Sequence, residues 1–249
     1  MMLPSYFMSL TMEFTTLVAR TAHARFHGCA GTVVDFGEAP SQLLENWLRV
    51  PPQLKRFSRH YATLSEDYLR HWQEKHKLAT DVPAPEPQLP DTAVARLLQA
   101  LPLRRTLNYL GDVEISTWDM AIHDPPSHQA LDAMDISEVY GRLQREISQL
   151  ATPWHQGEGD GSTHPYTTFS HMICGDYHAG YYGYLLSEMY AMDIFETLFK
   201  DDMENKELGR RYRHGFLEMG GRRPEMETLL DFLGREPDPG PFYRFLGIE

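Results

Sequence analysis

Helical periodicity runs through almost all of this 249-residue chain and constrains its fold more than any other feature. Apolar residues recur at three- and four-residue spacing in segment after segment, which is the pattern of helices that bury one face. The clearest example spans residues 181–200, where Leu185, Met189 and Met192 belong to one long helical pattern. Only Thr32–Val34 is expected to be extended, and no internal repeat is present. We therefore expect a mainly α-helical fold.

The breaks in the pattern set the expected bounds of the helices. Ser65, followed by two acidic residues, is a good N-cap, and Pro102 is expected to separate two helices. Four prolines between Asp81 and Pro90 mark either a linker or a long surface loop. The helices are expected at about 7–25, 38–51, 52–61, 65–77, 91–100, 103–123, 137–150, 181–200, 204–214, 225–233 and 242–246.

Composition excludes several classes of protein. The formal net charge of −12 repels phosphate backbones and anionic membranes, so neither nucleic acid nor a membrane is an expected partner. No apolar run approaches the roughly 18 residues of a membrane helix, and the first residues lack the basic region of a secretory signal. Cys29 and Cys174 form no CxxC motif, which favours a reducing compartment. We expect a cytoplasmic monomer with a single domain.

One predicted helix carries both apolar and acidic faces. Pro40 suits a first helical turn, and Glu38 lies beside the positive end of the helix dipole. Leu43 and Trp47 then fall on an apolar face, while Glu38 and Glu45 share a different face. On pattern alone this is an ordinary amphipathic helix with solvated acids.

Two segments resemble a known family when they are taken together. The run from Asp35 to Trp47, Asp-Phe-Gly-Glu-Ala-Pro-Ser-Gln-Leu-Leu-Glu-Asn-Trp, is similar to the segment that follows the zinc motif in the thimet oligopeptidase, neurolysin and saccharolysin family. The run from Gly175 to Leu185, Gly-Asp-Tyr-His-Ala-Gly-Tyr-Tyr-Gly-Tyr-Leu, resembles that family's substrate loop. The resemblance covers residues 17–249, and residues 1–16 form a diverged or unrelated segment.

The resemblance implies a zinc-dependent endopeptidase that hydrolyses internal bonds of short peptides. This chain would be the C-terminal part of the helical catalytic domain and would supply one wall of the peptide channel. Glu38 would be the third ligand of a single zinc ion, and the hydroxyls of Tyr177 and Tyr184 would polarise the scissile carbonyl. The residues to which the resemblance assigns substrate contacts are His171, Gly175 and Tyr181.

The zinc motif itself is missing. Such peptidases need His-Glu-x-x-His, in which two histidines one turn apart hold the metal and the glutamate deprotonates its water. The resemblance places that motif on either Met8–Met12 or Met12–Thr16, and neither segment contains a histidine. We therefore predict that the chain is inactive as it stands. The alternative function is a non-catalytic, peptide-binding or regulatory relic of the family.

A different histidine pair precedes Glu38. His23 and His27 are four residues apart, but Ala24 stands where the catalytic glutamate belongs, and a glycine-rich turn follows at once. We interpret the pair as partly exposed histidines near a helix end. A zinc site made by His23, His27 and Glu38 is the alternative interpretation.

Overall fold

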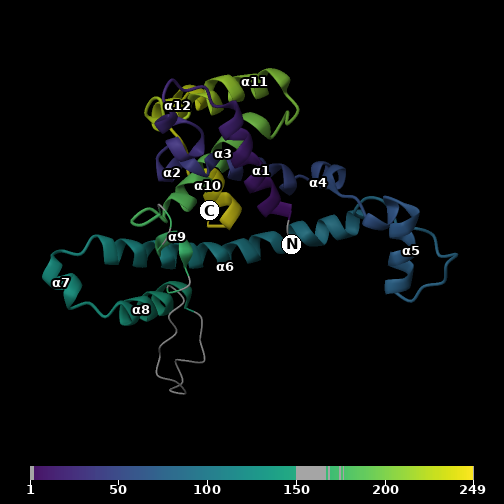
Figure 1. The fold of residues 1–249 in the computed structure, drawn as a ribbon, viewed down its shortest axis with the longest axis horizontal. Helices are drawn as coiled ribbons and strands as arrows, with labels where there is room; N and C mark the ends of the chain where they lie inside the picture. Colours follow the sequence, from purple (N-terminus) through teal and green to yellow (C-terminus); the bar gives the residue numbers. More distant parts are fainter. Residues whose placement is uncertain (1–2, 150–166, 168, 174, 176, 249) are drawn as a thin grey trace, which may run out of the picture.

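A computed structural model of the chain describes residues 3–149, 167, 169–173, 175 and 177–248. Every regular element in these residues is helical and none is a strand, which confirms the predicted mainly α fold. The expected extended piece is confined to Thr32 and Val33, because Val34 already begins a helix. Among the described helices, none is both long and apolar enough to cross a membrane. Figure 1 shows a dense lobe that lies against one very long helix.

The lobe is built around one hydrophobic core. Helix α3 crosses the core beside α10, and each helix contributes a fully buried side chain to it, Leu43 from α3 and Ile194 from α10. Helix α1 packs along α3, and α11 and α12 cover the side farthest from α6 (Figure 1). The bounds of the lobe helices are Leu3–Val18 (α1), Val34–Gly37 (α2), Ala39–Glu45 (α3), Gly183–Ile194 (α10), Lys206–Gly215 (α11), Glu225–Leu233 (α12) and Gly240–Leu246 (α13). The helix expected at 181–200 is confirmed, since α10 continues as a π-helical turn over Phe195–Phe199.

The long helix α6 runs without a break from Asp91 to His123, so the expected division at Pro102 is wrong. Proline removes one hydrogen bond from a helix interior, but the loss of this bond does not interrupt α6. Pro102 is exposed, and Thr106 donates a hydrogen bond to the Pro102 carbonyl at 2.9 Å. On the lobe side, α6 packs against α4, α10 and α13, and these tertiary contacts hold the helix together across the proline.

Two arms extend from the ends of α6 (Figure 1). At one end, the predicted cap Ser65 accepts a hydrogen bond from the Tyr68 N–H and begins α5. At the other end, α8 folds back along α6 around a small cluster that includes Trp118 and Leu143. The bounds of the remaining helices are Pro51–Phe57 (α4), Glu66–Lys75 (α5), His128–Asp132 (α7), Ile136–Ser148 (α8) and Ser170–Ile173 (α9). The proline-rich segment is a mostly exposed loop, and hydrogen bonds tie it to the chain before α5: the His60 N–H donates to the Pro87 carbonyl at 2.7 Å, and the Leu89 N–H donates to the Ser58 hydroxyl at 3.0 Å.

Candidate functional site

Glu38 is a buried carboxylate at the start of α3. It occupies the N-cap position between α2 and α3, and only 2% of the residue is exposed. Its carbonyl accepts the first hydrogen bond of the helix, from the Gln42 N–H. Ser41, one turn into α3, donates from its hydroxyl to that same carbonyl at 2.8 Å and to Oε2 of Glu38 at 3.2 Å. The local sequence therefore both begins the helix and satisfies one carboxylate oxygen.

The other carboxylate oxygen contacts the segment from Gly175 to Leu185, which we call the tyrosine loop. The Tyr177 hydroxyl donates to Oε1 of Glu38 at 2.7 Å, across 139 residues of sequence. The Tyr177 ring stacks on the Tyr184 ring, with centroids 4.9 Å apart and planes 16° from parallel. Tyr181 packs beside Tyr184 at 5.1 Å. The structure thus brings the predicted carboxylate and all three predicted tyrosines into one cluster.

The tyrosines of this cluster stay protonated at neutral pH. Burial is the main reason that the pKa of Tyr177 lies far above its usual value, and the hydrogen bonds that its hydroxyl makes to Tyr184 and Glu38 raise it further. Burial likewise raises the pKa values of Tyr181 and Tyr184. Neutral phenols can donate hydrogen bonds to a carbonyl oxygen, which is the chemistry that the resemblance assigns to two of them.

Glycine lets the tyrosine loop lie directly on α2. A side chain at Gly183 would place its Cβ atom 2.7 Å from the Val34 carbonyl oxygen, so no larger residue fits there. Two hydrogen bonds fix the segment that follows: Gln42 donates from its side chain to the Tyr184 carbonyl at 3.1 Å, and Ser187 donates to the Asp35 carbonyl at 3.0 Å. The loop is therefore held against the same elements that position Glu38.

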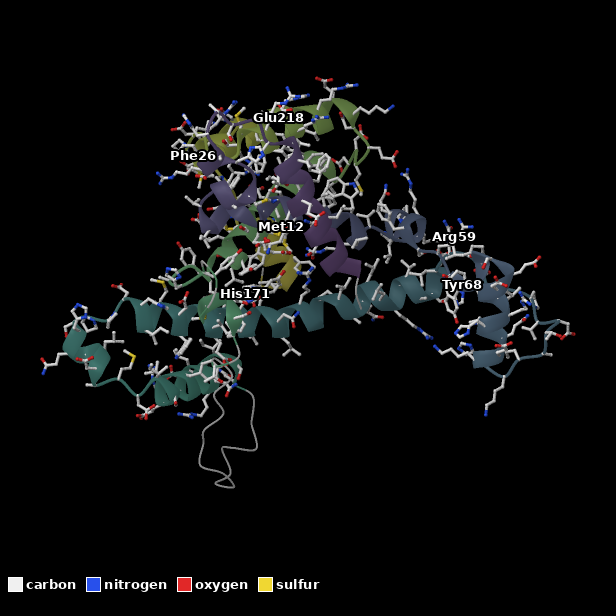
Figure 2. All side chains as sticks on the ribbon, viewed as in Figure 1. Met12, Phe26, Arg59, Tyr68, His171 and Glu218 are labelled. Carbon is white, nitrogen blue, oxygen red and sulfur yellow. The ribbon has the colours of Figure 1, made fainter. Side chains whose placement is uncertain are left out.

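His171 and Gly175 lie on the open side of the cluster. His171, on α9, is exposed and lies where α9 meets α6 (Figure 2). Its ring approaches the rings of Tyr177 and Tyr184 at 5.9 and 6.2 Å. Gly175 passes so close to the His171 carbonyl that a Cβ atom would be 2.7 Å from it. Cys174 and Asp176, which complete the loop motif, lie outside the described residues.

The groups around Glu38 do not suit zinc. The buried face of α1 carries Thr11 and Thr15, one helical turn apart, and the Thr15 hydroxyl donates to the Thr11 carbonyl. Burial raises the pKa of Cys29, the nearby thiol, to about 11, so in the absence of a metal it remains protonated at neutral pH. In the part of the chain that the structure describes, no group of three His, Cys, Asp or Glu side chains could hold a metal ion.

The histidine pair before Glu38 has a structural use instead. The two ring nitrogens of His27 lie 2.9 Å from the Thr16 carbonyl and 3.3 Å from the Thr21 hydroxyl, so both already have partners. His23 packs edge-on against Phe26, which lies at the outer edge of the lobe (Figure 2). The alternative zinc site of His23, His27 and Glu38 is therefore wrong, because these side chains form no metal-binding group.

Beneath the tyrosine cluster lies a buried network of charges. Glu188 is 1% exposed and lies 2.6 Å from Arg49 and 3.7 Å from Arg105. Arg105, on α6, also lies 2.6 Å from Glu45. Glu45, which shares the acidic face of α3, is thus an ion-pair partner between α3 and α6. The sequence pattern did not reveal Glu188, because it lies inside an apolar helical run with no local partner.

A second group that the sequence did not reveal is Asp119 on α6. This carboxylate is fully buried and accepts hydrogen bonds from two backbone N–H groups of the tyrosine loop. The only local signal is His123, four residues later, whose Nδ1 lies 2.8 Å from Oδ1 of Asp119. An Asp and a His at this spacing are common on helix surfaces, so the pair does not by itself indicate a buried contact.

Comparison with known proteins identifies one peptidase family and several of its members as similar to this chain. The sequence model of peptidase family M3 matches residues 14–248. The chain is 35% identical to oligopeptidase PhomG of Diaporthe leptostromiformis, over 85% of this chain and 30% of PhomG. It is 28% identical to saccharolysin of Saccharomyces cerevisiae, over 98% of this chain and 30% of saccharolysin. A relative from Arabidopsis thaliana with "cytosolic oligopeptidase A" in its name is 28% identical, over 86% of this chain and 27% of that protein. The chain thus spans less than a third of the length of these relatives.

Proposed function

Since this chain belongs to peptidase family M3, we propose that Glu38 and the tyrosine loop form part of a peptide-binding wall, and that these 249 residues bind short peptides without hydrolysing them. The family resemblance of the two sequence segments is confirmed by the family match and by the relatives. This proposal of peptide binding is made for these 249 residues alone, because they span only 30% of the length of saccharolysin.

One observation carries the proposal: the Tyr177 hydroxyl donates to Oε1 of Glu38 at 2.7 Å. A carboxylate that held zinc would direct its oxygens at the metal and would need two further nitrogen or sulfur ligands near it. Glu38 instead accepts from Tyr177 and Ser41, so it acts as a hydrogen-bond acceptor that orients the loop. A lone carboxylate binds zinc too weakly to retain it.

The tyrosine cluster retains features that suit a peptide. The Tyr184 hydroxyl supplies a neutral donor for a backbone carbonyl, the Tyr177 hydroxyl, which donates to Glu38, can accept from a backbone N–H, and Tyr181 and His171 add ring faces for side chains. Glycine at position 175 lets the loop pack directly against the His171 backbone beside the rings. We assign peptide contacts to these residues and propose short peptides as the partners.

A zinc-dependent endopeptidase is the second candidate, because the family consists of zinc peptidases. In that case zinc would activate the attacking water, and the chain would need ligands other than those around Glu38. The described residues offer no such set, so we place this function second.

The first test measures zinc and cleavage together. The zinc content of the purified protein is determined by mass spectrometry, and cleavage of a quenched-fluorescence peptide is followed with and without a chelator. We expect no bound zinc and no cleavage, together with saturable binding of the same peptide measured by fluorescence anisotropy. About one zinc per chain with chelator-sensitive cleavage would overturn the proposal, as would a failure to bind any peptide in a diverse set.

Tyr177→Phe and Tyr182→Phe form a matched pair for the binding assay. Tyr182 lies in the same loop but is 39% exposed, so its hydroxyl is not committed to Glu38. We expect weaker peptide binding only for Tyr177→Phe. We further propose that the protein is a cytoplasmic monomer that binds neither nucleic acid nor membranes, and size-exclusion chromatography with light scattering tests the monomer.

A further inference from the structure

The carboxylate of Asp119 joins α6 to the tyrosine loop. Oδ1 accepts from the Ala179 N–H at 2.9 Å and Oδ2 accepts from the Tyr181 N–H at 3.1 Å, 60 and 62 residues away. No part of the Asp119 side chain is exposed. A buried carboxylate is costly unless its oxygens are hydrogen-bonded, so both loop N–H groups are strongly favoured as its partners.

The loop needs this fixed point because its backbone is strained. Ala179 has a φ of +55°, in the left-handed region that residues with a side chain rarely adopt. The carboxylate holds the N–H groups on either side of Gly180, just where the chain turns toward the Tyr181 and Tyr184 rings. The third partner of Asp119, His123, is a neighbour on α6 and lies outside the loop.

We infer that Asp119 is a positioning residue for peptide binding: it clamps the Ala179 and Tyr181 N–H groups and thereby sets the orientation of the tyrosine rings. The inference rests on the proposed function only for its consequence, which is peptide affinity. The clamp itself is a property of the fold and can be measured without any ligand.

The clamp is tested by amide hydrogen exchange of the full chain, comparing the wild type with Asp119→Asn. The asparagine keeps the size of the side chain but replaces one acceptor oxygen by a donor. We expect exchange to rise about tenfold or more at the amide that faces the new NH₂ group, Ala179 or Tyr181, which corresponds to one lost hydrogen bond to a charged group. Unchanged exchange at both amides in the folded variant would overturn the inference.

Asp193→Asn is the matched control. Asp193 is also fully buried, and it accepts from Arg235 and from the Asp238 N–H at the far end of α10. The Asp193→Asn variant should lower the free energy of unfolding as Asp119→Asn does, but it should leave amide exchange at Ala179 and Tyr181 unchanged. An equal rise at both amides in Asp193→Asn would show general loosening of the fold and would overturn the clamp.

A backbone variant covers the case in which Asp119→Asn does not fold. Replacing Tyr181 by its α-hydroxy analogue turns one N–H into an ester oxygen and leaves the carboxylate in place. We expect this protein to bind the anisotropy peptide about tenfold more weakly than the wild type. Unchanged affinity would overturn the positioning role, whereas absence of binding by the wild type would contradict the proposed function and leave the exchange result standing.

Discussion

The lobe and the α8 arm are both helical, but they are stabilised in different ways. Among the residues that the structure describes, the lobe core has fifteen buried residues contributed by several helices, whereas the cluster between α6, α8 and α9 has four. The arm helices rely more on local features, such as the Asp135 side chain that accepts from two N–H groups at the start of α8. We therefore expect the lobe to contribute most of the free energy of unfolding and the arm to add a smaller, more local contribution.

The candidate site lies where these two regions meet. Glu38 and α10 belong to the lobe, whereas Asp119 and Arg105 project from α6. The tyrosine loop is consequently held from both sides by buried carboxylates. Substitutions in the lobe core should destabilise the whole protein. Substitutions at the junction should disturb the tyrosine loop, and substitutions in the arm should have the most local effects on stability.

Leu43→Ala is expected to have the largest effect. Leu43 is fully buried in the lobe, and removing its side chain should lower the free energy of unfolding by about 4 kcal/mol. Leu143→Ala in the arm cluster should lower it by about 2 kcal/mol, because that smaller cluster collapses more readily around the change. Urea denaturation followed by circular dichroism measures both. Equal losses for the two variants would contradict the expected difference in stability between the lobe and the arm.

Glu188→Gln tests the buried junction between the lobe and α6. Removing this charge leaves Arg49 and Arg105 incompletely compensated, and we expect a loss of about 3 kcal/mol. Glu204→Gln is the control, since the Glu204–Arg56 pair is exposed and should contribute less than about 1 kcal/mol. If both substitutions have the same effect, burial does not determine how much these two ion pairs contribute to stability.

Tyr177→Phe removes the contact between the loop and Glu38. The buried carboxylate loses its 2.7 Å donor, and we expect a loss of about 2 kcal/mol in the free energy of unfolding. Tyr182→Phe, at an exposed position of the same loop, should change it by less than about 0.5 kcal/mol. If Tyr177→Phe leaves the free energy of unfolding unchanged, the loop is not held from the lobe side.

Asp112 gives the smallest expected effect, and it depends on pH. Burial, followed by repulsion from Glu188, raises the pKa of this α6 carboxyl from 3.8 to about 6. The folded chain therefore binds more protons than the unfolded chain between these values, and the free energy of unfolding falls as pH rises through the window. Because Asp112 is partly exposed, Asp112→Asn should recover only about 1 kcal/mol at pH 8 and almost nothing at pH 4. Urea denaturation at both pH values checks this, and an equal gain at both would contradict it.

Local sequence signals determined most of the helices and part of the site. Ser65 caps α5 as predicted, and Glu38 with Pro40 begins α3 as predicted. These signals succeed because helix starts, caps and amphipathic faces depend on residues within a few positions of one another. The similarity of two segments to one family also selected Glu38 and the tyrosines, which the structure brings together.

The way in which these parts are held depends on tertiary contacts. Pro102 lies inside a continuous helix, His27 binds backbone and hydroxyl groups instead of a metal, and Asp119 reaches a loop 62 residues away. Each outcome depends on packing against elements that are distant in sequence, so no local pattern contains it. The sequence specifies which residues can form helices and which side chains can donate or accept hydrogen bonds. The burial of each charge beside a particular partner depends on the packing of the lobe against α6.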